Sequence, residues 1–383
     1  MKMLFSVLKV KLCLQFVFFF GIGIPLVYAA LPTTTGWYAI PNTSLRTICP
    51  PNNYGGTGYM FMDNCPAVTT AWNGGAMDTK RNRLIVWGGG HKDYFGNEVY
   101  ALNLNDSSIQ RLTDPGSPIA ALDACVPAIA GGTQPNSRHT YDGITYMPNV
   151  DKLFVFGGAS AGAGCDLRDT WTFDLATLRW QLMNPTGTLP QQGAGTVTAY
   201  DPNTGKVFVH DTYNLYAYDF AANSYQQLAA GNYIDYHLTG VIDPVRKKFV
   251  LIGKGQAWIY DISPTGTYTR QALVTTGGSA IVDSMYPGMA YDPTTDRIVA
   301  WNGGSTVYSL NLTTNVWTPL TYSGGPGLAQ TNGTYKRWSY SPASGVFVLI
   351  NSMGDNAYVL RTGSGGTAPP PVDATPEIGR AHV

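Results

Sequence analysis

The sequence has few charged residues and no excess of either sign. Lys and Arg number 24, Asp and Glu also number 24, and charged residues make up 13% of the 383 residues. A chain without a basic excess lacks the electrostatic footprint of a nucleic-acid-binding protein. A chain that is 44% hydrophobic is not a disordered one either. Recognition of a ligand must therefore depend on local pockets and aromatic side chains.

Metal-binding and phosphate-binding motifs are missing as well. The sequence contains no C-x-x-C spacing, no phosphate-binding loop and no zinc-protease helix motif. Kinase and zinc-protease functions are therefore not expected, and no cofactor is assigned. What the sequence has in abundance is glycine, with 44 residues, and tyrosine, with 24. Together they favour strands joined by tight turns, which indicates an all-β fold.

The N-terminal segment has the pattern of an export signal. Residues 1–29 contain three lysines, an apolar run from Leu12 to Val27 and a small-residue cleavage pattern, which together predict a cleaved signal peptide. An uncleaved membrane anchor is the alternative, but the run of about 16 residues is short for a spanning helix of roughly 20. We therefore expect a secreted protein, extracellular or periplasmic, that is free of the membrane.

Four cysteines remain after Cys13 leaves with the signal peptide. An even number of cysteines in an exported chain indicates disulfides. Pairing of nearest neighbours would join Cys49 to Cys65 and Cys125 to Cys165. Four cysteines allow three connectivities, so this pairing is a preference, and metal binding by thiolates is the weaker alternative.

Six units repeat along the chain. In each, a strand of alternating apolar residues precedes a second, aromatic strand, and such alternation is typical of β-strands. The first of these strands cover residues 83–89, 152–158, 206–210, 248–253, 297–304 and 346–351. The second cover residues 98–102, 170–175, 215–219, 257–261, 307–310 and 357–360. A further strand precedes this pair and another follows it in several units, so each unit has the four strands of a propeller blade.

Paired glycines, then an aromatic strand, then a tryptophan resemble the kelch repeat over residues 31–362. The resemblance, to kelch-repeat and galactose-oxidase-like β-propellers, implies six four-stranded blades. Seven blades are the alternative, because residues 113–137 form a long insertion. The sixth unit lacks its fourth strand, and Gly36–Pro41 is expected to supply it and close the ring. Such propellers include sugar oxidases, polysaccharide lyases, epimerases and binding scaffolds, so the fold alone does not choose a function.

The expected domain organisation follows from these patterns. A signal peptide spans residues 1–29 and the propeller spans residues 30–362. Residues 363–376 form a Gly/Pro-rich linker, after which another domain is expected. Residues 377–383 resemble translated sequencing-adapter read-through and are excluded from the reasoning. We expect the propeller to be a monomer.

The candidate site lies where loops converge on one face of the disc. The loop Gly88–Glu98 of the first blade places reactive side chains between glycines, although local hydrogen bonding alone is the alternative reading. The segments leading into the innermost strands add a second group, and His210 is expected near the same rim. The candidate catalytic residues are His91, Tyr94, His139, Tyr236 and His237. The candidate substrate-binding residues are Asp93, Asn97, Arg138, Lys336, Arg337 and Trp338.

These residue types favour a polysaccharide lyase that cleaves a uronate-containing glycan by β-elimination. Arg138 and Arg337 would neutralise the uronate carboxylate, since an Arg fork fits a carboxylate well. His139 and His237 would serve as neutraliser or base, and Tyr236 or Tyr94 as acid or base. The resemblance to propeller lyases is in residue types only.

Two alternatives stay open. Tyr236-His237 is similar to an adjacent ligand pair of the galactose-oxidase-like copper radical oxidases, but a later histidine is missing and a Cys–Tyr crosslink would need a free thiol. The other alternative is a non-catalytic propeller that binds glycan or protein through Trp72, Tyr94 and Trp338. A structural cation at His91 and Asp93 is also conceivable, but two ligands are too few to name the metal.

Overall fold

We describe a computed structural model of the chain that covers residues 31–117, 124–160 and 165–363. The expected signal peptide and nearly all of the expected linker and tail lie outside the described residues. In the described part, no helix is long and apolar enough to cross a membrane. The structure is dominated by short antiparallel sheets, in agreement with the predicted all-β fold.

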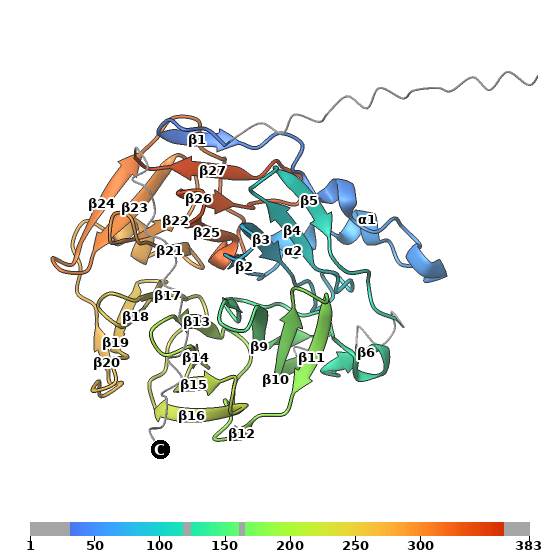
Figure 1. The fold of residues 1–383 in the computed structure, drawn as a ribbon, viewed down its shortest axis with the longest axis horizontal. Coiled ribbons are helices and arrows are strands. Elements are labelled where there is room, and N and C mark those ends of the chain that lie inside the picture. Colours follow the sequence, from blue (N-terminus) through green and yellow to red (C-terminus); the bar gives the residue numbers. More distant parts are fainter. Residues whose placement is uncertain (1–30, 118–123, 161–164, 364–383) are drawn as a thin grey trace, which may run out of the picture.

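Apart from one small hairpin, the described strands form six sheets that are arranged around a central axis like the blades of a propeller (Figure 1). Blade 1 contains β2 (Gly75–Asp78), β3 (Arg83–Val86), β4 (Tyr100–Asn103) and β5 (Ser108–Arg111). Blade 2 contains β8 (Ile144–Met147), β9 (Lys152–Ser160), β10 (Cys165–Asp174) and β11 (Arg179–Met183). Blade 3 contains β13 (Val197–Asp201), β14 (Lys206–His210), β15 (Leu215–Asp219) and β16 (Ser224–Ala229), with β12 (Thr186–Gly187) as a fifth, parallel strand.

The remaining three blades follow the same order from the axis outward. Blade 4 contains β17 (Thr239–Asp243), β18 (Lys248–Gly253), β19 (Gln256–Asp261) and β20 (Arg270–Ala272). Blade 5 contains β21 (Gly288–Asp292), β22 (Arg297–Trp301), β23 (Thr306–Asn311) and β24 (Val316–Thr321). Blade 6 contains β25 (Trp338–Ser341), β26 (Val346–Leu349), β27 (Tyr358–Arg361) and the N-terminal strand β1 (Gly36–Ala39). The prediction of six blades is therefore confirmed.

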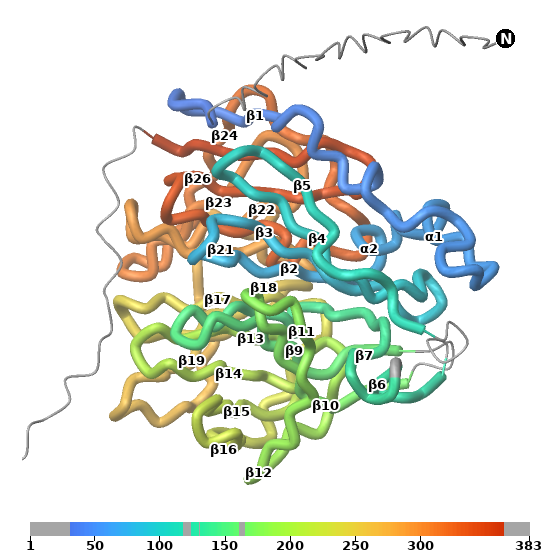
Figure 2. Tube along the Cα trace, turned by 45° about the vertical axis from the view of Figure 1, so that its right-hand side comes forward, coloured from blue at the N-terminus to red at the C-terminus, as the bar shows by residue number. Residues whose placement is uncertain are grey.

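The ring is closed by the N-terminal strand. β1 pairs with β27 in antiparallel register, with Gly36 opposite Arg361 and Ala39 opposite Tyr358. Figures 1 and 2 both show the two strands, blue and red, side by side at the outside of the blade. This pairing covers a sheet edge that would otherwise present unpaired backbone groups and invite aggregation. The predicted closure by Gly36–Pro41 is thus confirmed.

The blades are held together by apolar side chains between neighbouring sheets. Between blades 5 and 6, Trp338 is fully buried and stacks on Phe347 at a centroid distance of 4.8 Å. It also contacts Trp37 of the closing strand and Trp301. Trp338, predicted to bind substrate, therefore lies in the core of the propeller and offers no surface to a ligand.

The insertion after blade 1 does not form a seventh blade. It contains a small hairpin of β6 (Ala128–Ile129) and β7 (Gln134–Pro135) with the 3-10 turn η3 (Ala130–Gly132). The disulfide Cys125–Cys165 ties the insertion to β10 of blade 2.

The second disulfide, Cys49–Cys65, joins two of the short helical segments that connect β1 to blade 1. Both predicted cysteine pairs are therefore confirmed. The helical segments of this connection are η1 (Leu45–Ile48), η2 (Tyr54–Gly56), α1 (Phe61–Asn64) and α2 (Ala67–Thr70). Two more lie elsewhere, α4 (Ser279–Val282) before blade 5 and η4 (Tyr335–Arg337) before blade 6.

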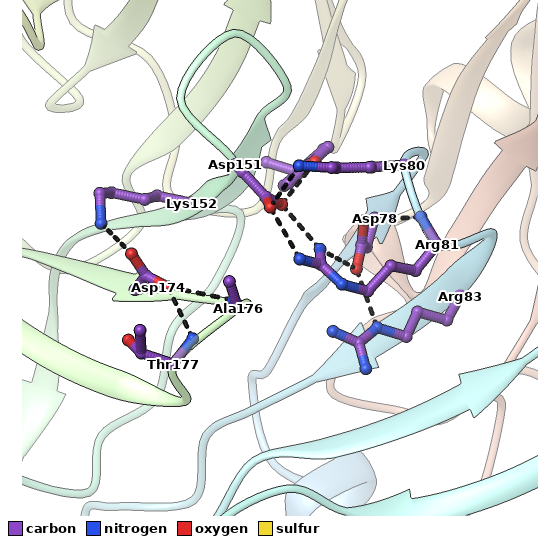
Figure 3. A network of polar contacts seen from close by, with 10 residues as sticks. Asp78, Lys80, Arg81, Arg83, Asp151, Lys152, Asp174, Ala176 and Thr177 are labelled. Atoms are coloured by element: carbon purple, nitrogen blue, oxygen red, sulfur yellow. Dashed lines mark hydrogen bonds and ion pairs between the residues drawn. The ribbon is translucent and has the colours of Figure 1, made fainter.

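The turns between the first and second strands of each blade lie on one face, which we call the lower face. There, the Arg81 guanidinium of blade 1 donates two hydrogen bonds of 2.7 Å to the carboxylate of Asp151 in blade 2 (Figure 3). Blades 4 and 5 repeat this link, with Arg246 bound to Asp296. Two pairs of neighbouring blades are thus joined by the same bidentate contact.

Candidate functional site

The opposite, upper face carries the loops that lead into the innermost strands. Around the axis on this face, the side chains of Tyr141, Tyr286 and Tyr335 form one cluster, against which Trp72 packs. Backbone hydrogen bonds link the segments that carry them, from Tyr141 to Trp72 at 2.8 Å and from Tyr286 to His237 at 2.9 Å. We call this aromatic rim the mouth.

The three tyrosines of the mouth share an unusual backbone conformation. Their φ angles are +49° at Tyr141, +53° at Tyr286 and +48° at Tyr335. The left-handed region is unfavourable for bulky side chains and costs of order 1–3 kcal/mol at each position. Such strain collects at functional sites, where the surrounding structure holds a side chain in a required direction. The repeated strain therefore marks the mouth as a candidate site.

One side of the mouth carries two histidines and an aspartate. The Nε2 atom of His139 lies 2.6 Å from a carboxylate oxygen of Asp93, and the ring of His91 packs against that of His139 at a centroid distance of 5.1 Å. His139 is 1% exposed, whereas His91 is partly exposed. The structure therefore brings His91, Asp93 and His139 together on the upper face.

Gly90 allows the loop of blade 1 to lie close to the segment of blade 2 that carries His139. Gly90 has a φ of +61°, and a Cβ atom there would lie 2.2 Å from the Cα atom of Arg138. Only a residue without a side chain fits in this position. The glycine-rich loop of blade 1 is thereby able to bring His91 and Asp93 against His139 of blade 2.

Burial favours the uncharged forms of His139 and of the three tyrosines of the mouth. It lowers the pKa of His139, although the hydrogen bond to Asp93 acts in the opposite direction. Burial also raises the pKa values of Tyr141, Tyr286 and Tyr335. At neutral pH the imidazole of His139 can therefore accept a proton, and the phenols hold theirs.

The opposite side of the mouth is formed by the loop that leads into blade 4. The Nδ1 atom of His237 is hydrogen-bonded to Asp235, and its ring lies 4.6 Å from that of Tyr286. Lys254 approaches to 3.4 Å from the same Nδ1 atom and 3.1 Å from the Asp235 carboxylate. Burial raises the pKa of Asp235, but the hydrogen bonds from His237 and Lys254 outweigh it and lower the value. The side chain of Tyr236, 44% exposed, lies next to His237.

Below the mouth, an ion pair lies across the axis. The Lys336 ammonium is 2.8 Å from the carboxylate of Asp142, and both residues are buried or nearly so. Burial raises the pKa of Asp142 to about 6 even though Lys336 lowers it. On the far side of this pair, a cavity of about 240 Å³ opens toward the lower face. Lys336, predicted to bind substrate, therefore lies beneath the mouth rather than on its rim.

The two predicted carboxylate clamps lie away from the mouth. Both arginines are fully buried. The guanidinium of Arg138 binds the carboxylate of Asp169 in two hydrogen bonds of 2.7 and 3.1 Å. That of Arg337 is surrounded by backbone carbonyl groups, among them those of Ile350 and Asn351. The side chains of Arg138 and Arg337 therefore hold loops together inside the propeller and form no part of the candidate substrate-binding site.

Two residues of the blade 1 loop are also turned inward. Tyr94 is fully buried and donates a hydrogen bond to Glu98, and the Asn97 amide binds the carbonyl of Pro135 at 2.8 Å. The structure thus separates Tyr94 and Asn97 from His91 and Asp93, although all four belong to one loop.

The fourth histidine of the propeller is not at the mouth. His210 is fully buried, and its Nε2 atom lies 2.7 Å from the hydroxyl of Tyr260 in blade 4. Burial lowers the pKa of His210 to about 3. The expectation that all four histidines lie on the rim is therefore corrected, because His210 packs between blades 3 and 4.

Sequence reasoning missed the aromatic rim itself. Tyr141, Tyr286 and Tyr335 were not among the predicted site residues, and Trp72 was considered only as a binding residue. A signal was nevertheless present, because a Trp or Tyr precedes the innermost strand of five blades by two or three residues. These residues are Trp72, Tyr141, Tyr236, Tyr286 and Tyr335.

Comparison with known proteins gives limited but consistent results. No protein-family model matches the chain. Over 90 residues, the chain is 37% identical to Host cell factor 1 of Homo sapiens, Mus musculus and Rattus norvegicus. This segment is 23% of the chain and only 4% of the length of those relatives. Six four-stranded blades and a closing N-terminal strand decide the fold class. The chain is a six-bladed β-propeller.

Two solved structures resemble the propeller at low sequence identity. One is a protein of unknown function from Bacteroides thetaiotaomicron, with a TM-score of 0.49 and 9% identity, covering 76% of this chain and 69% of the other. The other is a fungal alcohol oxidase of the AA5 family in complex with copper, with a TM-score of 0.45 and 13% identity, covering 76% and 62%. Likenesses this distant carry no argument about activity.

The residues of the propeller do not fit a crosslinked copper radical site. The four cysteines in the described residues form two disulfides, so none of them has a thiol to join to a tyrosine. Nor do residues 31–117, 124–160 and 165–363 contain three His, Cys, Asp or Glu side chains close enough to share a metal ion. We therefore derive no chemical step through a metal.

Proposed function

We propose that the propeller is a secreted carbohydrate-active enzyme that cleaves a uronate-containing polysaccharide by β-elimination at the mouth. The observation that carries the proposal is the packing of His91 against His139, and of His139 against the buried phenol of Tyr141, on one strained aromatic rim. This is the combination that removal and return of a proton requires. The two disulfides support an oxidising compartment.

The proton acceptor we assign is His91. It is the more exposed of the two packed histidines, while His139, held by Asp93, positions it and stays neutral. His91 takes the proton from C5 of the uronate, the electron pair forms the C4–C5 double bond, and the bond from C4 to the leaving oxygen breaks. The leaving oxygen must then receive a proton.

The proton donor we assign is Tyr141. Its ring lies between His139, at a centroid distance of 6.1 Å, and Tyr236, which helps to raise its pKa. A phenol whose pKa is raised keeps its proton until the leaving oxygen develops charge. Tyr236, the exposed phenol beside it, forms the adjoining wall of the site.

The carboxylate of the uronate is assigned to the Lys254 side of the mouth. With the predicted arginines buried elsewhere, the Lys254 ammonium beside His237 is a cation on this side of the rim. It lies 5.9 Å from the centre of the Tyr236 ring. A cation there would stabilise the negative charge that develops on the carboxylate as C5 loses its proton.

The experiment is the absorbance near 235 nm of an unsaturated uronate, followed for the purified protein with a panel of acidic polysaccharides. We expect a rise with at least one glycan, which His91→Ala removes and His139→Ala shifts in its pH profile. The variant Leu328→Ala, which changes an exposed side chain that contacts none of the assigned groups, is the control and should behave as the wild type. Absence of a rise with every acidic glycan would reject β-elimination.

Non-catalytic glycan binding is the second candidate function. The exposed ring of Tyr236 at the mouth favours it, because aromatic faces pack well against sugar rings. A propeller of this kind would bind an acidic polysaccharide without producing absorbance at 235 nm. Its affinity would survive His91→Ala and fall with Tyr236→Ala, which separates it from the enzyme.

A further inference from the structure

Two tyrosines outside the mouth have side chains that are about half exposed to solvent. Tyr213 lies in the loop between β14 and β15 and is 47% exposed, and Tyr233 lies in the loop between β16 and β17 and is 52% exposed. Their ring centroids are 5.2 Å apart with a tilt of 52°. Within the described part of the chain, these two and Tyr236 are the only aromatic side chains exposed to this degree. All three belong to the loops of blades 3 and 4 on the upper face.

The loops that carry the two rings are paired and rigid. The backbone of Asn232 donates to the carbonyl of Tyr213, and that of Ile234 donates to the carbonyl of Thr212, both at 2.7 Å. The Arg270 guanidinium donates to the carbonyl of Tyr233. Exposed rings are thus held in place by backbone contacts, which reduces the entropy lost when a ligand binds.

The loop of Tyr213 is also strained. The carboxylate of Asp211 accepts hydrogen bonds from the backbone of Gln191, Tyr213 and Asn214 at 2.7 to 3.0 Å. Thr212, held between these contacts, has a φ of +76°. For a β-branched residue this conformation is a true outlier, and such strain persists where a function requires it. The strained residue directly precedes the exposed Tyr213.

This pair of rings is continuous with the mouth. Tyr236 follows Tyr233 by three residues in the same loop and forms part of the rim. At Gly195, with a φ of +71°, a Cβ atom would lie 2.3 Å from the Cβ atom of Tyr236 and 3.2 Å from Thr212. Tyr236 and the loop of Tyr213 therefore both pack against Gly195. The exposed rings of Tyr236, Tyr233 and Tyr213 thus extend from the mouth over blades 3 and 4.

We infer that Tyr213 and Tyr233 form a sugar-stacking subsite that holds a pyranose unit of the glycan bound at the mouth. The inference rests on the proposed function in taking a glycan as the ligand, but it does not require cleavage. Aromatic faces attract the C–H faces of a sugar ring, and both rings of the pair are about half exposed. A sugar unit several residues from the cleaved bond would be held here, so the subsite favours long chains over short ones.

The test is native affinity electrophoresis of the full chain in gels that contain acidic polysaccharides, together with kcat and KM for polymer and for short oligosaccharides where cleavage is measured. We expect the variant Tyr213→Ala with Tyr233→Ala to bind the polymer about tenfold more weakly. The matched double exchange to Phe should bind as the wild type, because stacking does not need the hydroxyl groups. Leu328→Ala, which removes an exposed apolar side chain, serves as the surface control.

The outcomes separate this inference from the proposed cleavage. Weaker binding by the Ala variant with retention by the Phe variant supports the subsite, whether or not the protein produces absorbance at 235 nm. In an active protein, KM for the polymer should rise while kcat for short oligosaccharides stays unchanged. Equal binding of the Ala variant and the wild type overturns the inference. So does a failure of the wild type to bind any polysaccharide, and a protein partner would then be the alternative occupant.

Discussion

The two faces of the propeller treat their ionisable groups in opposite ways. On the lower face, Arg81 holds the pKa of Asp151 well below its usual range, and Arg246 lowers the pKa of Asp296 to about 2. These acids are ionised and paired. At the mouth, burial instead lowers the pKa of His139 and raises that of Tyr141, so both are uncharged at neutral pH. The lower face thus joins neighbouring blades through charge pairs, whereas the mouth holds buried uncharged groups beside the pair of Asp235 and Lys254.

Loop length explains the difference. The turns between the first and second strands on the lower face are only a few residues long. Their arginine and aspartate side chains reach the turn of the next blade and form ion pairs with each other. The loops that lead into the innermost strands on the upper face are longer, and three of them carry a tyrosine in a strained conformation. Short turns whose charged side chains are paired contribute to the stability of a fold. Longer loops on a rigid scaffold are where binding and catalytic residues are usually found. The comparison can be tested by matched changes on the two faces.

The largest effect is expected from Tyr141→Phe. Loss of the phenol removes the proposed proton donor, and kcat for elimination should fall by at least about a hundredfold. The same exchange on the lower face is the control, because Tyr146 donates a hydrogen bond of 3.0 Å to Asp151. Tyr146→Phe should keep kcat and cost about 1 kcal/mol of stability. Equal loss of kcat in both variants would contradict the assignment of the site to the upper face.

Arg246→Ala should be the most destabilising change on the lower face. The carboxylate of Asp243 is 2% exposed, and Arg246 is its only cationic partner in the described residues. An unpaired buried carboxylate should cost about 3 kcal/mol in the free energy of unfolding, measured with urea at pH 7. The partner Asp296 has a lowered pKa, so its share of the stabilisation is present above about pH 4 and is lost as the pH falls toward 2. The gap between variant and wild type should shrink over that interval.

His210 should make the stability of the propeller depend on pH between about 3 and 6.5. Burial lowers its pKa in the folded protein to about 3, below the unfolded value of about 6.5. The unfolded chain therefore binds the proton first, and stability falls as the pH drops below about 6.5, by up to about 1.4 kcal/mol per pH unit. His210→Leu should flatten this slope in urea titrations. An unchanged slope would show that the acid sensitivity comes from other groups.

The smallest effect is expected from Arg81→Ala. Although Arg81 makes the same bidentate contact as Arg246, Asp151 keeps Lys80 as a partner and Asp78 keeps Arg83. No buried carboxylate is left without a cation, so the cost should be about 1 kcal/mol. A cost equal to that of Arg246→Ala, measured in the same urea experiment, would show that the contact itself, and not the remaining partners, decides the loss.

Much of the fold could be predicted because its determinants are local. The alternation of apolar residues in β3 and β9 identifies strands without knowledge of their neighbours. Repetition of that pattern fixes the number of blades, and the missing fourth strand of the last unit points to Gly36–Ala39. The cysteine pairs were predicted by proximity along the chain. Each of these inferences needs only the order of residues.

The site was predicted in part. His91, Asp93 and His139 come together as expected, since the repeat places their loops on one face. Arg138 directly precedes His139, yet its buried side chain turns into blade 2 and binds Asp169 of β10 and the carbonyl of Gly157 in β9. Adjacent residues in an extended segment point in opposite directions, and the sequence does not reveal which of the two faces the axis.

By itself, the sequence determined the strands, the six repeated blades, the closing N-terminal strand and the face on which the loops gather. Those features depend on alternation, glycine content and periodicity, which are readable along the chain. Only the tertiary structure decided which polar side chains reach the mouth, which ones form hydrogen bonds inside the propeller, and which ones become uncharged through burial. Those properties depend on the surroundings of each group in space, and a pKa or a hydrogen bond has no local signature in the order of residues.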